Sequence, residues 1–185
     1  MHKSTKWLIW ELGTVILIVA ILGFLRHPLI FSYQWHKLLH ILGAIFLVGN
    51  IVITGVWMFM AERTNNSDVM RFAASMVNWA DVFFTVPGIF LLITNGDILS
   101  EQWGGVFRVS WIVASLILFV FSGIVWIGLL LRYQSSFITL SNSMHIENDS
   151  SQFFTILHKW YFWGAIATVF PIISLVLMFL KPNLW

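Results

Sequence analysis

The sequence predicts an all-α polytopic membrane protein, a four-helix transmembrane bundle plus one N-terminal anchor helix. Hydrophobic residues make up 59% of the 185 residues and charged residues only 10%, whereas about a quarter of a soluble domain is charged. The mean hydropathy is +0.86. Five apolar stretches are each long enough to cross about 30 Å of hydrocarbon as a helix. The 11 Trp and 17 Phe fit the same class, because aromatic rings gather at membrane–water interfaces.

The composition also excludes several functions. Ten Lys and Arg stand against eight Asp and Glu, which leaves no basic patch for nucleic acid. The chain has no cysteine. This excludes disulfides, thiolate metal sites, iron–sulfur clusters and covalently attached c-type haem.

The five predicted spans cover residues 7–25, 35–61, 72–94, 106–131 and 153–180. We interpret 7–25 as a retained anchor, because Glu11 interrupts its apolar run and no small-x-small cleavage site follows. The predicted domains are therefore the anchor, residues 1–30, and the bundle, residues 31–185. Turn-forming residues around Asn65 separate the second and third spans. A Ser- and Asn-rich polar connection, residues 132–152, precedes the last span.

The distribution of Lys and Arg predicts the orientation. With the N-terminus inside the cell, six basic residues lie on the inner side: Lys3, Lys6, Arg63, Arg71, Arg132 and Lys159. The outer side then carries Arg26, Lys37, Arg108 and Lys181. Because inner loops are the richer in Lys and Arg, this favours an inner N-terminus and an outer C-terminus.

Polar and small residues recur at helical spacing within the last four spans. The second span carries His36, His40, Gly43, Asn50 and Thr54, and the third carries Asn78, Asp81, Thr85, Gly88 and Asn95. The fourth has Arg108, Ser115 and Ser122, and the fifth has His158, Tyr161, Ala165 and Thr168. Steps of three, four and seven place each set on one face, so we expect these faces to point into the bundle.

The polar residues are expected to form two layers. His36, His40 and Arg108 lie toward the outer side, with Arg108 expected a short way into the fourth helix at the depth of His40. His158, Glu62, Asn78 and Asp81 lie toward the inner side. Since His40 and His158 enter from opposite faces of the membrane, they are not expected to share one haem iron.

Three interpretations of the outer layer stay open. His40 could be one axial ligand of a haem b, with Arg108 pairing a propionate. His36 and His40, four residues apart, could instead hold one copper or other divalent metal ion. In the third interpretation both histidines are structural, and the protein is a cofactor-free accessory subunit of a larger membrane complex.

The second to fifth spans contain several short motifs: Leu38-Leu39-His40-Ile41-Leu42-Gly43-Ala44, Val86-Pro87-Gly88-Ile89, Trp103, Trp111, and Ser122-Gly123 with Trp126. In these motifs the chain resembles an uncharacterised bacterial family of predicted four-helix integral membrane proteins. More distantly, the arrangement of spans and motifs is similar to that of HemJ-type protoporphyrinogen oxidases and of copper-resistance membrane domains.

The distant resemblance implies a function. In HemJ-type enzymes an early histidine is linked to haem, a position that His40 matches, and Pro87-Gly88 and Lys181-Pro182 match two further motifs. The expected lysine after Trp103 is replaced by Arg108, which stays protonated and cannot serve as a base. We therefore expect a haem-b-linked redox protein of a bacterial plasma membrane, with a tetrapyrrole as the first substrate class. Its expected partners are the lipid bilayer and either other membrane proteins or a second copy of the chain.

Overall fold

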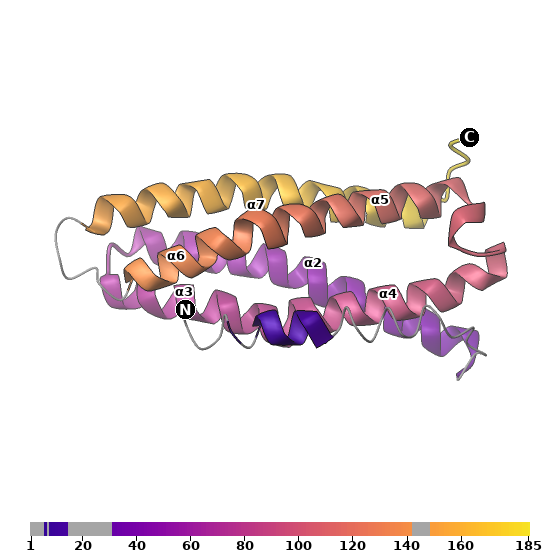
Figure 1. Ribbon diagram of the computed structural model, residues 1–185, viewed down its shortest axis with the longest axis horizontal. Coiled ribbons are helices and arrows are strands. Elements are labelled where there is room, and N and C mark those ends of the chain that lie inside the picture. Colours follow the sequence, from indigo (N-terminus) through magenta and orange to yellow (C-terminus); the bar gives the residue numbers. More distant parts are fainter. Residues whose placement is uncertain (1–5, 7, 15–30, 142–148) are drawn as a thin grey trace.

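The computed structural model describes residues 6, 8–14, 31–141 and 149–185, and this part of the chain is helical with short connections (Figure 1). Its main helices are α2 (Tyr33–Arg63), α3 (Ser67–Ala80), α4 (Val86–Ser100), α5 (Ser110–Val125), α6 (Leu131–Ser141) and α7 (Asp149–Leu180). Two π-helical turns, η1 (Asp81–Thr85) and η4 (Trp126–Leu130), join α3 to α4 and α5 to α6. The described residues contain no strand, so the all-α prediction is confirmed.

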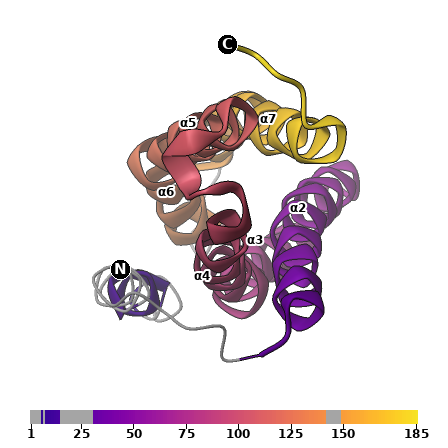
Figure 2. The ribbon, with the colours of Figure 1, turned by 90° about the vertical axis from the view of Figure 1, so that its right-hand side faces the viewer.

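Within the described residues, four helical rods are long and apolar enough to cross a membrane. They cover Tyr33–Arg63, Ser67–Trp103, Ser110–Ser141 and Ser151–Leu180. The rods run along one common direction (Figure 1), and Figure 2 looks along them, with α2 lying between α4 and α7. This confirms the predicted four-helix bundle. Each rod is longer than the 20 or so residues that hydrocarbon requires, so its ends reach the polar interface.

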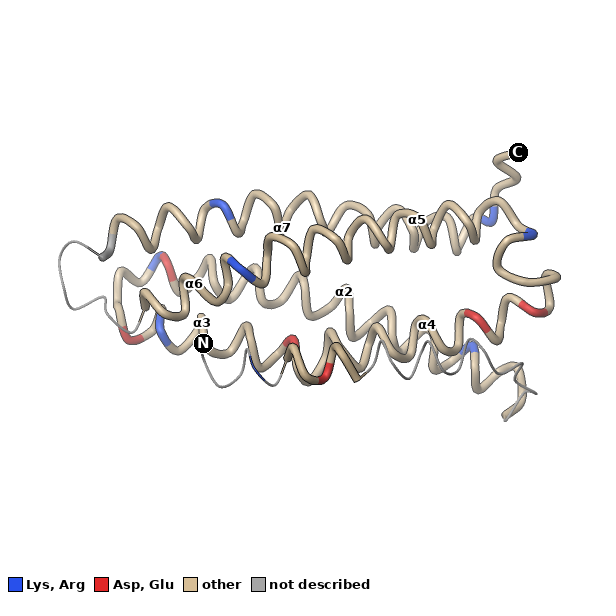
Figure 3. The backbone as a smooth tube through the Cα atoms, viewed as in Figure 1, with Lys and Arg blue, Asp and Glu red and all other residues tan. Residues whose placement is uncertain are grey.

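Successive rods run in opposite directions and define two ends of the molecule. The Arg63 end contains the α2–α3 turn and the start of α7, and the Arg108 end contains the start of α2, the α4–α5 connection and Lys181 (Figure 1). Most charged residues lie toward these two ends, with few along the middle of the rods (Figure 3). This pattern is expected where hydrocarbon surrounds the middle.

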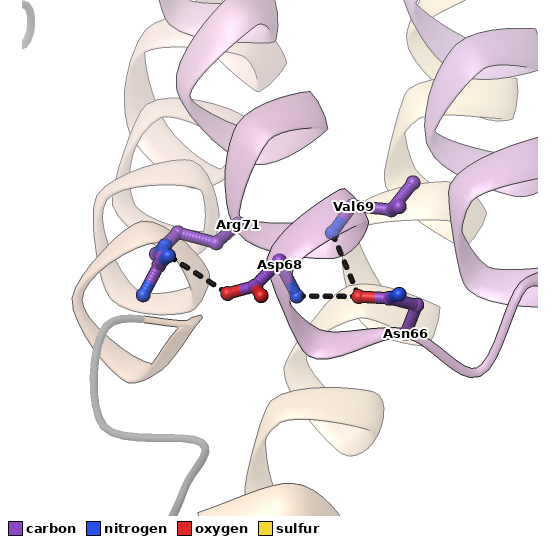
Figure 4. Close-up of polar contacts among 4 residues, drawn as sticks. All are labelled: Asn66, Asp68, Val69 and Arg71. Carbon is purple, nitrogen blue, oxygen red and sulfur yellow. Dashed lines mark hydrogen bonds and ion pairs between the residues drawn. The ribbon is translucent and has the colours of Figure 1, made fainter.

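The turn at the Arg63 end is built from the residues that predicted it. The Asn66 side chain caps α3 by accepting hydrogen bonds from the backbone N–H groups of Asp68 (2.9 Å) and Val69 (3.3 Å) (Figure 4). Asn65 has the left-handed φ of 49° that asparagine tolerates better than most residues. Arg71 then pairs with Asp68 at 2.8 Å (Figure 4), at the end where an acidic residue suits the helix dipole.

The third and fourth spans differ from their predicted bounds, and the third already begins at Ser67 rather than at residue 72. The third span does not end at residue 94 but continues through Asn95 and Gly96 to Ser100. The fourth begins at Ser110 rather than at residue 106, because Gly104 and Gly105 adopt φ values of 85° and 102° and Val106–Arg108 forms a separate 3-10 turn, η3.

The connection predicted over residues 132–152 was also wrong at both edges. Residues 132–141 belong to α6, and α7 begins at Asp149. The cause is a buried face of α6 at steps of three and four: Gln134, Phe137, Ile138 and Ser141. Phe137 packs edge-on against Phe153 and Trp160 of α7, so tertiary packing holds this polar sequence in a helix.

The predicted anchor lies mainly outside the described residues. Within it, residues 8–14 are helical, and Leu8 is fully buried. Leu8 packs in one apolar cluster with Val82 and Val86, next to the π turn η1. The described part of the anchor therefore contacts the bundle at the middle of the second rod.

The arrangement predicts that residue 140 and the C-terminus face opposite sides of the membrane, since α7 crosses the bundle between them. Reporter fusions truncated after Leu140 should give the cytoplasmic signal, and fusions after Trp185 the external one. The matched control is a fusion after Thr64, which lies at the same end as Leu140 and should report the same side. Identical signals from Leu140 and Trp185 would contradict the span assignment.

Candidate functional site

Two glycines allow α2 and α4 to approach closely toward the Arg108 end. A Cβ on Gly43 would lie 2.8 Å from the backbone oxygen of Gly88 and 2.8 Å from the backbone nitrogen of Leu92. A Cβ on Gly88 would lie 3.0 Å from the Gly43 oxygen. Close backbone contact at small residues is a common way for membrane helices to associate. It brings the first turns of α2, with both histidines, against α4.

His36 is buried, and both of its ring nitrogens are occupied. Nδ1 lies 2.8 Å from Oδ1 of Asn95, while Nε2 accepts a 3.4 Å hydrogen bond from the backbone N–H of Phe31. Asn95 in turn donates from Nδ2 to the Leu91 carbonyl at 2.9 Å. These partners are mutually consistent when His36 donates from Nδ1. His36 therefore fits a structural link between α2 and α4.

His40 is half-buried and is held differently. Its Nδ1 lies 2.9 Å from the carbonyl oxygen of Leu92, so this nitrogen must donate. The ring lies against Gly96, where an added Cβ would be 2.9 Å from Cε1 of His40. Nε2 of His40 has no hydrogen-bond partner within the part of the chain that is described. The arrangement fixes the neutral tautomer with its lone pair on Nε2, the form that binds a metal.

Arg108 lies outside the helix in which it was expected. It ends the 3-10 turn η3, before α5 begins at Ser110, and its side chain is exposed. The reason is the Gly104-Gly105 pair and the η3 turn that follows it, after which α5 begins about one turn later than the apolar pattern indicated. Arg108 does lie at the same end of the bundle as His40. The structure records no contact between the two residues.

Lys181, Trp103 and Trp111 form a cluster that sequence analysis did not assemble. The ammonium of Lys181 lies 5.1 Å from the ring centre of Trp103 and 5.8 Å from that of Trp111. The two indole rings pack edge-to-face at 5.8 Å. Such cation–π contacts hold the C-terminal residues over the α4–α5 connection. Motif residues that are far apart in the sequence thus meet at the Arg108 end.

A second polar centre lies at the middle of the bundle, so the expected inner layer was wrong for Asn78 and Asp81, which do not lie with His158 and Glu62. Asp81 is 6% exposed, which confirms that it faces protein. It accepts hydrogen bonds from Asn50 (3.0 Å), Thr85 (2.8 Å) and Gln134 (2.9 Å). Gln134 also donates to Oδ1 of Asn78 at 2.6 Å, so Asn78 and Asp81 share this donor. Sequence analysis missed Gln134, and the spacing of buried residues in α6 is the signal that could have found it.

The histidine at the other end is an interfacial residue. His158 and Glu62 are 2.9 Å apart, with His158 the more exposed of the two. They line an open hollow of about 420 Å³ together with Phe59, Arg63 and Tyr161. His40 and Glu62 are 22 positions apart on α2, a distance of about 33 Å along a helix. His40 and His158 therefore lie in separate layers, as predicted.

The described residues contain no group of three or more His, Asp or Glu side chains able to hold a metal ion. The hydrogen bonds above use both nitrogens of His36 and one of His40. Of the predicted ligands, only His40 thus presents a ring nitrogen without a partner in the described structure.

The fold and the buried polar centres define a polytopic integral membrane protein. Residues 34–182 match the family described as "Predicted integral membrane protein (DUF2269)", and the chain belongs to this family. No curated protein and no solved structure matches the chain.

Proposed function

We propose that this protein is a haem-b-linked redox protein of a bacterial plasma membrane, with His40 as an axial ligand. The observation that supports this most directly is the hydrogen bond from His40 Nδ1 to the Leu92 carbonyl at 2.9 Å. Histidines that bind metals commonly donate their other ring N–H to a carbonyl or carboxylate, which orients the ring and raises the basicity of the ligand. A bound haem b would supply one-electron chemistry at this end of the bundle.

Other residues of the Arg108 end suit an anionic cofactor. Arg108 is exposed there, and Lys181 lies against Trp103 and Trp111. Either cation could pair with a propionate, which is costly to bring near hydrocarbon without a counter-charge. The resemblance of His40, Pro87-Gly88 and Lys181-Pro182 to HemJ-type enzymes supports the same assignment. For an enzyme of this kind, the substrate class that we propose is a tetrapyrrole.

The test is the visible absorption spectrum of the purified protein and of single variants. We expect a b-type Soret band that His40→Ala removes. His158→Ala is the matched control, because His158 lies about 33 Å away along the bundle, and it should keep the band. His36→Ala should also keep it, since His36 is used by Asn95 and Phe31. A full haem content in His40→Ala would overturn the proposal.

Elemental analysis of the same proteins separates the alternative metal site. Loss of stoichiometric copper or another divalent metal from both His36→Ala and His40→Ala would favour a two-histidine site and contradict the haem assignment. A wild-type protein purified from its native membrane with neither haem nor metal would favour a cofactor-free accessory subunit.

A further inference from the structure

The polar centre around Asp81 joins three of the four rods. Asn50 comes from α2, Asn78 from α3, Asp81 and Thr85 from η1, and Gln134 from α6. Their exposed fractions are all 6% or less. An apolar cluster that includes Met58, Val77 and Leu130 packs on the side toward the Arg63 end. The centre is therefore enclosed, and neither lipid headgroups nor bulk water hydrate its carboxylate.

The hydrogen bonds of this centre converge on one carboxylate. Oδ1 of Asp81 accepts from the Asn50 amide and from the Thr85 hydroxyl, and Oδ2 accepts from the Gln134 amide. The Asn50 amide also donates to Thr85 at 2.8 Å. All three donors are neutral. They orient and partly solvate the carboxylate without cancelling its charge.

No basic side chain pairs with Asp81 among the described residues, whose ion pairs are Arg71–Asp68 and His158–Glu62. On α2, the charged groups Glu62 and Arg63 lie 12 and 13 residues beyond Asn50, about 18–20 Å along the helix.

The charged groups on the other elements packed around the centre are equally unsuited to pair with it. On α3, Arg71 is ten residues before Asp81 and is paired with Asp68, and on α4 Asp97 is itself acidic. On α6, Arg132 is exposed. The described N-terminal residues, packed nearby through Leu8, carry the acid Glu11 and the exposed Lys6, which forms no ion pair with Asp81. An ionised carboxylate at this depth has a high cost unless a positive charge accompanies it.

Two of the three rods that carry the centre, Ser67–Trp103 and Ser110–Ser141, contain a π-helical turn next to it. In η1 the N–H of Val86 bonds to the carbonyl of Asp81, five residues back, and in η4 the N–H of Leu131 bonds to that of Trp126. Such turns insert one residue into a helix and recur at functional sites. Here η1 contains Asp81 and Thr85 themselves, and η4 ends four residues before Gln134.

We propose that the Asp81 centre is a binding site for one monovalent cation, H⁺ or Na⁺. A proton converts the carboxylate to a carboxylic acid, whose O–H then donates to an amide oxygen. For Na⁺ the ligands are a carboxylate oxygen of Asp81, the hydroxyl of Thr85 and the amide oxygens of Asn50 and Gln134. If the side-chain amide of Asn50 or Gln134 rotates by half a turn, its oxygen takes the position that its nitrogen occupied. Oxygen ligands suit hard cations, and the single negative charge of this set is balanced by one monovalent cation.

The test is difference infrared spectroscopy of the full-length protein in lipid nanodiscs. One arm changes the pH without Na⁺, and the other exchanges choline chloride for NaCl at constant ionic strength. If the site binds H⁺, a protonated-carboxyl band should appear in the first arm. If it binds Na⁺, the carboxylate bands should shift in the second arm. If it binds both, H⁺ and Na⁺ should compete, and each should weaken the response to the other. Asp81→Asn should remove these signals, and Glu62→Gln should keep them.

A second pair of variants covers the case in which Asp81→Asn does not fold. Thr85→Val removes one oxygen ligand at nearly constant volume and should shift the midpoint of the H⁺ or Na⁺ response at least threefold, while Thr85→Ser should restore it. The proposal is overturned by infrared bands that respond to neither cation in wild type. It is also overturned by responses that persist unchanged in a folded Asp81→Asn protein. These results do not depend on haem, so they are separable from the fate of the His40 assignment.

Discussion

Gly43→Leu is expected to leave no folded, monodisperse protein in detergent. Already the first atom of any side chain at this position would lie 2.8 Å from the Gly88 oxygen, 2.8 Å from the Leu92 nitrogen and 2.9 Å from Cβ of Leu91. Two of these three atoms are backbone, so no rotamer change can relieve the overlap. The α2 and α4 helices would have to separate, and the hydrogen bonds of His36 and His40 to α4 would be lost with them.

Gly43→Ala gives a graded version of the same experiment. Overpacking a close contact costs about 1–3 kcal/mol, and the contact with two backbone atoms places this substitution near the top of that range. The effect is measured as a change in melting temperature, with thermal unfolding monitored by size-exclusion chromatography. Gly49→Ala and Gly55→Ala on the same helix are the controls, since a Cβ at either position meets nothing within 4 Å. A melting temperature for Gly43→Ala equal to that of the controls would contradict the close crossing.

The interior faces of the second and third spans were predictable because polar and glycine residues are few in apolar helices. Gly43, Asn50 and Thr54 are buried on one face of α2, as their spacing predicted. The pairing partners were not predictable in the same way. Whether His36 meets Asn95 or a metal depends on the crossing of α2 and α4, and two glycines 45 residues apart in the sequence determine that crossing.

Two elements were missed because local composition and tertiary packing disagree there. The Ser-rich residues of α6 have weak helix propensity, yet Phe137 and Ile138 pack into the core and hold the helix. Gln134 was consequently placed in a connection rather than in the bundle. Conversely, the apolar pair Val106-Phe107 indicated a span, although the positive φ angles of Gly104 and Gly105 and the short η3 turn delay α5 to Ser110.

Asp81→Leu is expected to lower the free energy of unfolding by about 3 kcal/mol. The substitution removes the acceptor of the Thr85 hydroxyl and one acceptor each of Asn50 and Gln134. A buried donor without a partner costs about 1–3 kcal/mol, and the measured values inside membranes fall at the low end of such ranges. Asn50 and Gln134 keep one bond each, to Thr85 and Asn78, which limits the total.

Two further variants separate lost hydrogen bonds from lost charge. Asp81→Asn preserves the volume and one carbonyl acceptor, so it should lose less than half as much stability as Asp81→Leu. Asp97→Leu removes an exposed carboxylate from α4 and should change the stability by no more than about 0.5 kcal/mol. Denaturant unfolding in mixed micelles measures the free energy of unfolding of all three variants.

Equal stabilities of Asp81→Leu and Asp97→Leu would mean that the hydrogen bonds among Asn50, Thr85, Gln134 and Asp81 do not hold the bundle together. A larger loss in Asp81→Asn than in Asp81→Leu would mean that the amide, with two donors of its own, fits the three converging donors worse than an apolar side chain does.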